Sequence, residues 1–267
     1  MIGKKSMTDG RRAYGRAAIS SLVLALALTS CKLKPTFPAA TIVQDLKAMC
    51  LHDYKMNVDV RMENSTLQAF FWTVGLVSSQ TGEISPDAAE SLDRVVVCST
   101  RISLSTDAPL QFVQVKTADV LTGATVTLWR YVPDIEDSMH NRMGEEEFLN
   151  RLVLDVQTEG QHVNQTEGSP WDTPISLSQF IAKQVIQRAK RQNPALQVHE
   201  NLSDPTTLGF VIDNWPSFEQ QGVKQKQSVT GLVETMAKTV VKDYSYKGFH
   251  GLTLEDSQGS MLGRWNL

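Results

Sequence analysis

Polar and apolar residues alternate from Lys55 to Glu63, and the apolar members are Met56, Val58, Val60 and Met62. A period of two places these four side chains on one face of an extended chain. The segment is therefore predicted to be a strand of an antiparallel sheet with one buried face. The turn residues Asn64 and Ser65 follow, and the apolar and aromatic run Leu67 to Val74 predicts the returning strand.

Two helices and a second hairpin are predicted around this first hairpin. Before it, Thr41 and Gln44 have the spacing of a capping box, and apolar residues then recur at helical spacing: Ile42, Val43, Leu46, Met49 and Cys50. After it, Ser85-Pro86-Asp87 supplies a cap, a first-turn proline and an acidic residue, which predicts a helix through about Ile102. Strands at Leu110 to Val120 and Ala124 to Val132, joined at Thr122-Gly123, complete the order αββαββ.

The second half of the chain repeats this order after a polar stretch. Residues 155–174 contain two glycines and two prolines and predict a boundary between lobes. Ser176 and Gln179 then predict a capping box at the start of a helix that stops at Asn193-Pro194. The remaining predicted elements are short strands at Leu196 to Val198 and Thr206 to Ile212, a helix at Ser228 to Val241, and a hairpin of Phe249 to Glu255 with Ser260 to Leu267.

The predicted fold is α+β, with two antiparallel sheets and helices packed on one face. Residues 41–155 form the first predicted lobe, residues 156–174 the linker and residues 175–267 the second lobe. The equal element orders indicate either a duplicated αββαββ unit or a plain two-lobed protein, because an alternating pattern of this kind also recurs by chance.

The first residues differ in charge from the rest of the chain. The 267 residues carry a formal net charge of −3, of which residues 1–31 contribute +4 and the remainder −7. Nucleic-acid binding needs a concentrated basic surface that neutralises phosphates. The body of the chain has no basic run beyond Lys238 with Lys242 and the cluster from Arg188 to Arg191, so no nucleic-acid partner is expected.

The amino terminus has the layout of a secretory signal: a basic stretch, a short apolar run and small residues at its end. The apolar run from Ala17 to Leu28 would span about 18 Å as a helix, less than the roughly 30 Å hydrocarbon core of a membrane. At its end, Leu28-Thr29-Ser30-Cys31 resembles the lipobox of bacterial lipoproteins, in which an aliphatic residue and two small residues precede an invariant cysteine.

This resemblance implies that residues 1–30 are a lipoprotein signal peptide, cleaved between Ser30 and Cys31. It further implies a diacylglyceryl thioether on Cys31 and, in many bacteria, an acyl chain on the new amino terminus, which together anchor a protein stably. Residues 31–40 would then be the lipidated cysteine and a tether. In similar proteins an aspartate after the cysteine favours the inner membrane, so Lys32 points to the outer membrane, facing the periplasm. The alternative is a plain signal peptide with an incidental cysteine, or a short uncleaved anchor.

Cys50 and Cys98 are the remaining cysteines. Each lies on the apolar face of a predicted helix, and two helices on one sheet can bring them within the Cα separation of roughly 4.4–6.8 Å that a disulfide needs. An oxidising compartment would permit this possible disulfide. The alternative is that both are small buried hydrophobic residues.

The sequence contains no GxSxG, HExxH or glycine-rich phosphate motif, and its five histidines lack the paired spacing of zinc sites. The densest carboxylate region runs from Asp134 to Asp137 and from Glu145 to Glu147. These acids could bind calcium or transfer protons, as could the pair His52 and Asp53. Acidic residues are also ordinary in the first turn of a helix. No catalytic residue, metal ligand or cofactor is therefore assigned.

Aromatic residues gather on two predicted strands, at Phe70, Phe71 and Trp72 and at Trp129 and Tyr131. Both alternating faces of residues 127–131 carry bulky side chains. One face is therefore either a partner surface or a surface covered by the linker or the second lobe.

These features favour a lipid-anchored cell-envelope protein that binds or scaffolds envelope components without catalysis. Its expected partners are the membrane, through the lipid, and an envelope protein. An extracytoplasmic hydrolase with dispersed catalytic residues and a periplasmic carrier of a lipid or small ligand are the alternatives.

Overall fold

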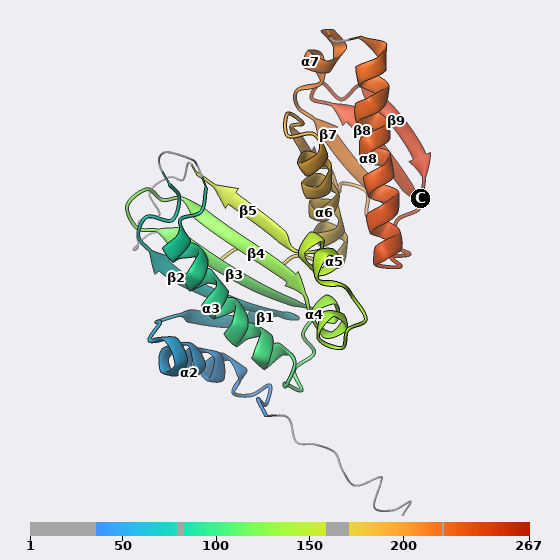
Figure 1. Cartoon of the computed structure of the whole chain (residues 1–267). Coiled ribbons are helices and arrows are strands. Elements are labelled where there is room, and N and C mark those ends of the chain that lie inside the picture. Colours follow the sequence, from blue (N-terminus) through green and yellow to red (C-terminus); the bar gives the residue numbers. More distant parts are fainter. Residues whose placement is uncertain (1–35, 79–82, 159–170, 221) are drawn as a thin grey trace, which may run out of the picture. The chain divides into compact units, whose positions relative to one another are not determined.

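A computed structural model describes residues 36–78, 83–158, 171–220 and 222–267 (Figure 1). Residues Phe37 to Leu267 form one compact unit that contains two separate β-sheets. Within the described ranges, no helix is both long and apolar enough to cross a membrane. The predicted signal peptide, the lipobox and Cys31 lie outside the described residues.

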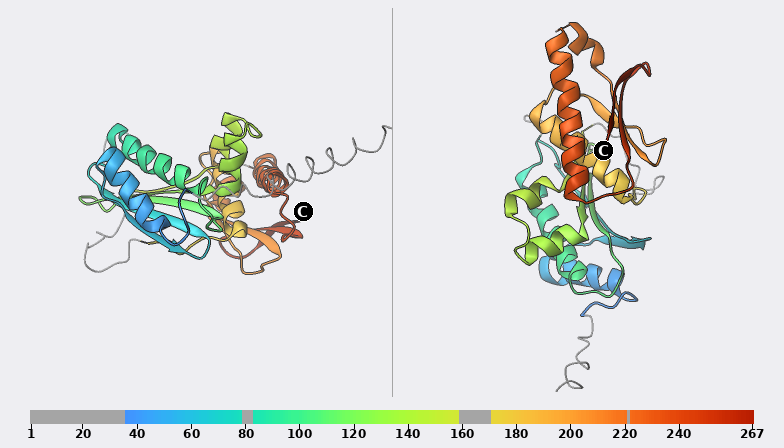
Figure 2. Two further views of the ribbon diagram at one scale, coloured as in Figure 1. Left: turned by 90° about the horizontal axis from the view of Figure 1, so that it is seen from below. Right: turned by 90° about the vertical axis from the view of Figure 1, so that its right-hand side faces the viewer.

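The first repeat has the predicted order of elements. It consists of α2 (Ile42–Tyr54), β1 (Asp59–Glu63), β2 (Thr66–Thr73), α3 (Pro86–Ser103), β3 (Phe112–Asp119) and β4 (Thr125–Tyr131). Three elements follow: α4 (Val132–Met139), the short α5 (Glu145–Asn150) and β5 (Val153–Gln157). Of these, α5 is the helix expected to carry Glu145 to Glu147 in its first turn, whereas α4 and β5 were not predicted. Helices α2 and α3 cover one face of the sheet β1-β2-β3-β4-β5 (Figure 1 and Figure 2).

The second repeat is built in the same way. It consists of α6 (Leu177–Gln192), β6 (Val198–Glu200), β7 (Thr207–Ile212), α8 (Val223–Asp243), β8 (Gly251–Asp256) and β9 (Met261–Asn266). A short helix, α7 (Trp215–Gln220), precedes α8. The strand order of this sheet is β6-β7-β8-β9, which matches the order of the first four strands of the first sheet.

The α+β fold is confirmed, but each sheet is mixed rather than antiparallel. In the first sheet β1 and β2 are antiparallel, as are β3 and β4, whereas β2 and β3 are parallel. In the second sheet β7 and β8 form the equivalent parallel pair between two antiparallel hairpins. The parallel pairs arise because α3 and α8 each cross between two strands, and a helical crossover returns the chain in its original direction.

The two repeats correspond position by position at the centre of their sheets. Thr66 pairs with Phe112 in the first sheet, and Thr207 pairs with Gly251 in the second, so β2 aligns with β7. Three buried residues of β2 then match three of β7, all within the core of their own repeat: Leu67, Ala69 and Phe71 with Leu208, Phe210 and Ile212. The chain therefore contains two αββαββ units of one topology.

The predicted caps form at two of the three helix starts. The hydroxyl of Ser85 accepts the N–H of Ala88, and Ser176 with Gln179 forms the predicted capping box. At α2 the predicted box is wrong, because the hydroxyl of Thr41 donates to the carboxylate of Asp45 at 2.8 Å. Thr41 also has a ψ of −1° in place of the extended conformation that lets a cap hydroxyl accept a backbone N–H.

Cys50 of α2 and Cys98 of α3 lie side by side in the core of the first repeat, as their helical positions predicted. Both are free thiols, so the possible disulfide is not formed in this structure. Burial raises the pKa of each thiol above its ordinary value. Because the thiolate is the reactive form, these two buried thiols are expected to react slowly.

Asp119 fixes the hairpin between β3 and β4. Its buried carboxylate accepts backbone N–H groups from Leu76 at 2.7 Å, Leu121 at 2.8 Å and Thr122 at 3.3 Å. Gly123 supplies the positive φ of 72° that the predicted tight turn requires. Burial alone would raise the pKa of Asp119, but the backbone donors outweigh it and hold this pKa below its ordinary value.

Replacement of Asp119 by alanine is expected to lower the free energy of unfolding by about 1–3 kcal/mol near neutral pH, because buried backbone donors lose their acceptor. A lowered pKa means that the carboxylate stabilises fully above its unfolded pKa of about 3.9, and that this contribution is lost as pH falls through the folded pKa. Urea unfolding of both proteins at neutral and at strongly acidic pH measures the difference, which should shrink in acid. Asp93→Ala, at an exposed position, is the control, and an Asp119→Ala difference that does not change with pH would contradict the prediction.

Candidate functional site

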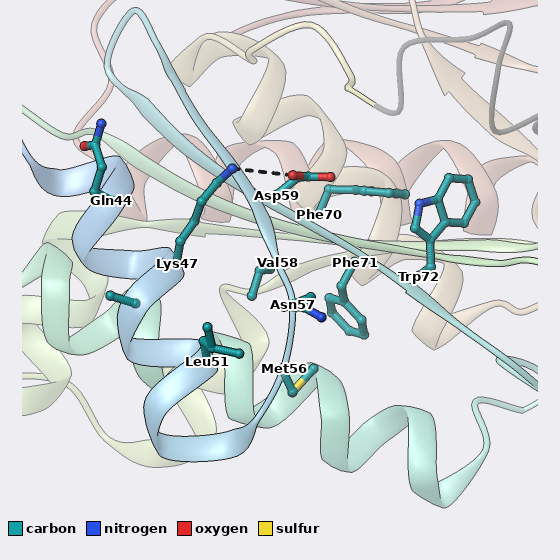
Figure 3. A pocket seen from close by; sticks show the side chains of 11 residues that line it. Gln44, Lys47, Leu51, Met56, Asn57, Val58, Asp59, Phe70, Phe71 and Trp72 are labelled. Carbon is teal, nitrogen blue, oxygen red and sulfur yellow. Dashed lines mark hydrogen bonds and ion pairs between the residues drawn. The ribbon is translucent and has the colours of Figure 1, made fainter.

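A groove of about 570 Å³ lies between α2, the residues that enter β1 and the end of β2 (Figure 3). Apolar side chains form most of its lining: Ala48, Leu51, Met56, Val58, Phe70, Phe71 and Trp72. In Figure 3, Leu51 on α2 lies across the groove from Met56 and Phe71. Leu51 is 50% exposed, so part of this apolar wall is open to solvent.

The rim of this groove is polar. The ammonium of Lys47 lies 3.4 Å from the carboxylate of Asp59, and the two side chains are 46% and 65% exposed. An exposed ion pair of this kind contributes at most about 1 kcal/mol. The pair therefore forms a weak bridge at the rim, and an incoming segment could displace it at little cost.

The groove also exposes one edge of β2. Lys55 has a left-handed φ of 59° as the cap of α2, so residues 55–58 turn away from the sheet and the predicted strand begins only at Asp59. Its pairing with β2 ends where Asp59 meets Phe70, although β2 continues to Thr73. The carbonyl of Thr73 accepts the N–H of Val120 on the β3 side. Alternation along the strand then directs the backbone groups of Trp72 toward the groove.

A second groove, of about 490 Å³, occupies the equivalent place in the second repeat. With an offset of 139 residues, the α2 residues that line the first groove match α6 residues that line the second: Gln44, Lys47, Ala48 and Leu51 with Lys183, Ile186, Gln187 and Lys190. The same offset matches the buried faces of the two helices: Ile42, Leu46 and Cys50 with Ile181, Val185 and Ala189. The two grooves are therefore the same feature of a repeated unit.

The second groove differs in having a strand along its other side. Val153, Leu154 and Asp155 of β5, the edge strand of the first sheet, line it together with β6. The backbone N–H of Leu154 donates to the side-chain oxygen of Gln187 on α6 at 3.1 Å. Helix α6 thus covers the outer edge of the neighbouring sheet.

A polar network that was not predicted lies on the face of the first sheet that α2 and α3 do not cover. The carboxylate of Asp172 accepts hydrogen bonds from Lys116 at 2.6 Å and from Gln114 at 2.9 Å. Its backbone carbonyl accepts from Arg61 and from Gln68, each at 3.0 Å. Gln68 and Gln114 are almost fully buried and also bond to each other. The chain that leads into the second repeat is therefore held through both its backbone and its side chain.

Phe70 and Tyr131 of the first sheet are contacted by the linker and the second repeat, as one of the two predicted interpretations required. Trp171 lies edge-on to the buried Phe70, with ring centroids 6.1 Å apart. Tyr131 meets Phe180 of α6 and Tyr244 at the end of α8, at centroid distances of 6.2 and 5.7 Å. The linker and the second repeat thus contact Phe70 and Tyr131, whereas Trp72 is half-buried and lines the first groove.

Asp134, one of the predicted acidic residues, is buried where the two repeats meet. It accepts a hydrogen bond from the hydroxyl of Tyr244 at 2.8 Å and pairs with Arg151 at 2.8 Å. Arg151 also pairs with Glu147 at 2.5 Å, which gives one of the predicted first-turn acids a structural partner. Burial raises the pKa of Tyr244, so its hydroxyl stays protonated and donates to Asp134.

The structure does not bring the other predicted acid–base residues to one place. His52 lies 2.8 Å from Asp53 on the exposed surface of α2, and this contact, with Arg101, holds the pKa of Asp53 below its ordinary value. No described contact joins this pair to Asp134. Within the described residues, no cluster of three or more histidine, cysteine or acidic side chains could hold a metal ion.

The first groove offers non-covalent chemistry: apolar contact along its floor and backbone hydrogen bonds at the free edge of β2. An extended peptide can use both, because an added strand gains main-chain hydrogen bonds and places alternate side chains in pockets. The sequence signal for this site was the overlong predicted strand Lys55 to Glu63, whose first residues line the groove instead. Comparison of the chain with protein-family models, with curated proteins and with solved structures finds no significant match.

Proposed function

We propose that this chain is a lipid-anchored protein of the cell envelope that binds an extended segment of an envelope component in the groove between α2 and β2. The observation that carries the proposal is the groove itself, an apolar channel beside a strand end that, among the described residues, is paired on one side only. The protein acts as a binding or scaffold module, and no bond of the bound segment is made or broken.

The anchor in this proposal rests on the lipobox-like residues Leu28 to Cys31 and on the basic and apolar residues before them. Lys32 favours the outer membrane over the inner one. Cells fed radiolabelled palmitate should incorporate label into the wild-type protein and not into Cys31→Ala, which should also leave the membrane fraction. Label that persists in Cys31→Ala would contradict lipidation at this residue.

The groove is tested separately by site-specific photo-crosslinking in living cells. A photoreactive residue in place of Asn57, which is exposed and lines the groove, should give an adduct with an envelope protein. The adduct should decrease several-fold when Leu51→Asp is added, because a charge on the apolar wall opposes docking. A probe at Met139, which is 62% exposed on α4, is the matched control. Equal adducts with and without Leu51→Asp would contradict a role for the groove.

A further inference from the structure

In the second repeat, a strand of the neighbouring sheet lies along the groove. Its α6 face lies against β5, the edge strand of the first sheet, and Gln187 accepts the N–H of Leu154 from that edge. An uncovered edge strand presents a row of unpaired backbone groups to other chains. The helix of one repeat thus covers the sheet edge of the repeat before it.

The first repeat has the equivalent helix face without an equivalent strand. Leu51 takes the place of Lys190 and is half exposed, and Ala48 takes the place of Gln187 and leaves room above the helix. Among the described residues, no strand lies along this face of α2 in the way that β5 lies along α6. The apolar surface of the acceptor half is therefore present and open, although Ala48 lacks the side-chain oxygen with which Gln187 accepts the N–H of Leu154.

The donor half is the edge strand of the second sheet. Strand β9 is the last strand of the second sheet, as β5 is of the first, and in the described residues it pairs only with β8. Met261 on β9 is 54% exposed, and Arg264 is exposed as well. Arg264 carries a charge opposite to that of Asp59, which lies on the rim of the open groove. The side chain of Asp59 is 65% exposed.

We infer that the occupant of the open groove is a second copy of this chain, which docks the edge of its β9 against α2 as β5 docks against α6. This inference rests on the proposed binding role of the groove and names the partner. The contact joins two different surfaces, so copies assemble head to tail rather than around a two-fold axis. Each repeat then meets the next across the same kind of contact, whether within one chain or between two.

A complementation experiment with full-length protein in detergent tests the inference. Wild type should form oligomers that grow with concentration in sedimentation velocity. Leu51→Asp removes the acceptor surface, and Met261→Asp removes the donor surface. Each variant alone should therefore self-associate with an affinity at least about tenfold lower than that of wild type. Mixed together they should form a one-to-one dimer, because each retains the surface that the other lacks.

Two controls accompany this experiment. Leu51→Asp mixed with the double variant should stay monomeric, and Met139→Asp should assemble as wild type does. Both altered positions are exposed, and equal thermal unfolding of the variants verifies that they are folded. A wild type that is monomeric at every concentration overturns the inference, as do single variants that still assemble or a mixture that does not. If such a monomer still gives the Asn57 adduct with another envelope protein, the binding proposal survives and only the second copy is excluded.

Discussion

Replacement of Asp134 by alanine is expected to lower the free energy of unfolding by about 3–5 kcal/mol. The carboxylate is 6% exposed, and its loss leaves the 11% exposed Arg151 with Glu147 as its remaining charged partner. The hydroxyl of Tyr244 loses its acceptor at the same time. The cost is large because a buried charge or donor without a partner pays its full desolvation penalty.

Chemical denaturation followed by tryptophan fluorescence measures this effect. Asp137→Ala removes a carboxylate from the same helix, but its ion pair with Arg142 is exposed, so a change below about 1 kcal/mol is expected. Asp134→Asn keeps an acceptor for Tyr244, so its loss of unfolding free energy should lie between those of Asp134→Ala and Asp137→Ala. A loss for Asp134→Ala no larger than that for Asp137→Ala would show that the buried pair is not needed.

Replacement of Phe180 by alanine should lower the free energy of unfolding by about 3–5 kcal/mol. The ring is fully buried and lies 5.3 Å from the ring of Phe112 on β3 and 5.8 Å from that of Tyr244. Its removal leaves a cavity between the first sheet and the second repeat, where Trp129 and Val153 complete the same cluster.

Phe180→Leu is the matched variant, since it keeps most of the apolar volume and should cost about half as much or less. The two variants are compared by thermal and urea unfolding. If Phe180→Ala unfolds in two separate steps, the repeats have been uncoupled. An alanine variant as stable as the leucine variant would contradict the predicted cavity.

Local signals in the sequence predicted the order of the elements. The apolar and aromatic run Leu67 to Val74, the Thr122-Gly123 turn and the Ser176 to Gln179 capping box appear in the structure as β2, a tight hairpin and the start of α6, respectively. Such signals depend on residues a few positions apart, so a single sequence contains them.

Features that depend on distant residues could not be predicted in this way. The parallel pairing of β2 with β3 depends on where α3 places the returning chain, and hairpin signals do not report it. β5 was not predicted, and the boundary drawn between residues 155 and 156 cuts through it, because its five residues gain their partner only from β4. The bonds of Gln68 and Gln114 to Asp172 join residues 104 and 58 positions apart. The one local sign of this network was an isolated glutamine within each apolar strand.

The candidate groove was predicted in part. The residues that line it were identified, but as the start of a strand and as buried aromatic side chains. Their separation from the sheet follows from the left-handed cap at Lys55, a conformation that this residue type rarely adopts. The equivalence of the two grooves required the structure, because the residues of α2 and α6 that line them share almost no side-chain chemistry.

The contacts that the first sheet makes with Trp171 and Asp172 affect the order in which the chain folds. During synthesis from the amino terminus, β2 and β3 exist well before residue 172 does. Until it arrives, Lys116 and the two buried glutamines lack the oxygen atoms that they bind in the finished molecule. The first repeat therefore matures only when the second one begins to form, and a nascent chain that stops near residue 158 should still be a substrate for chaperones and proteases.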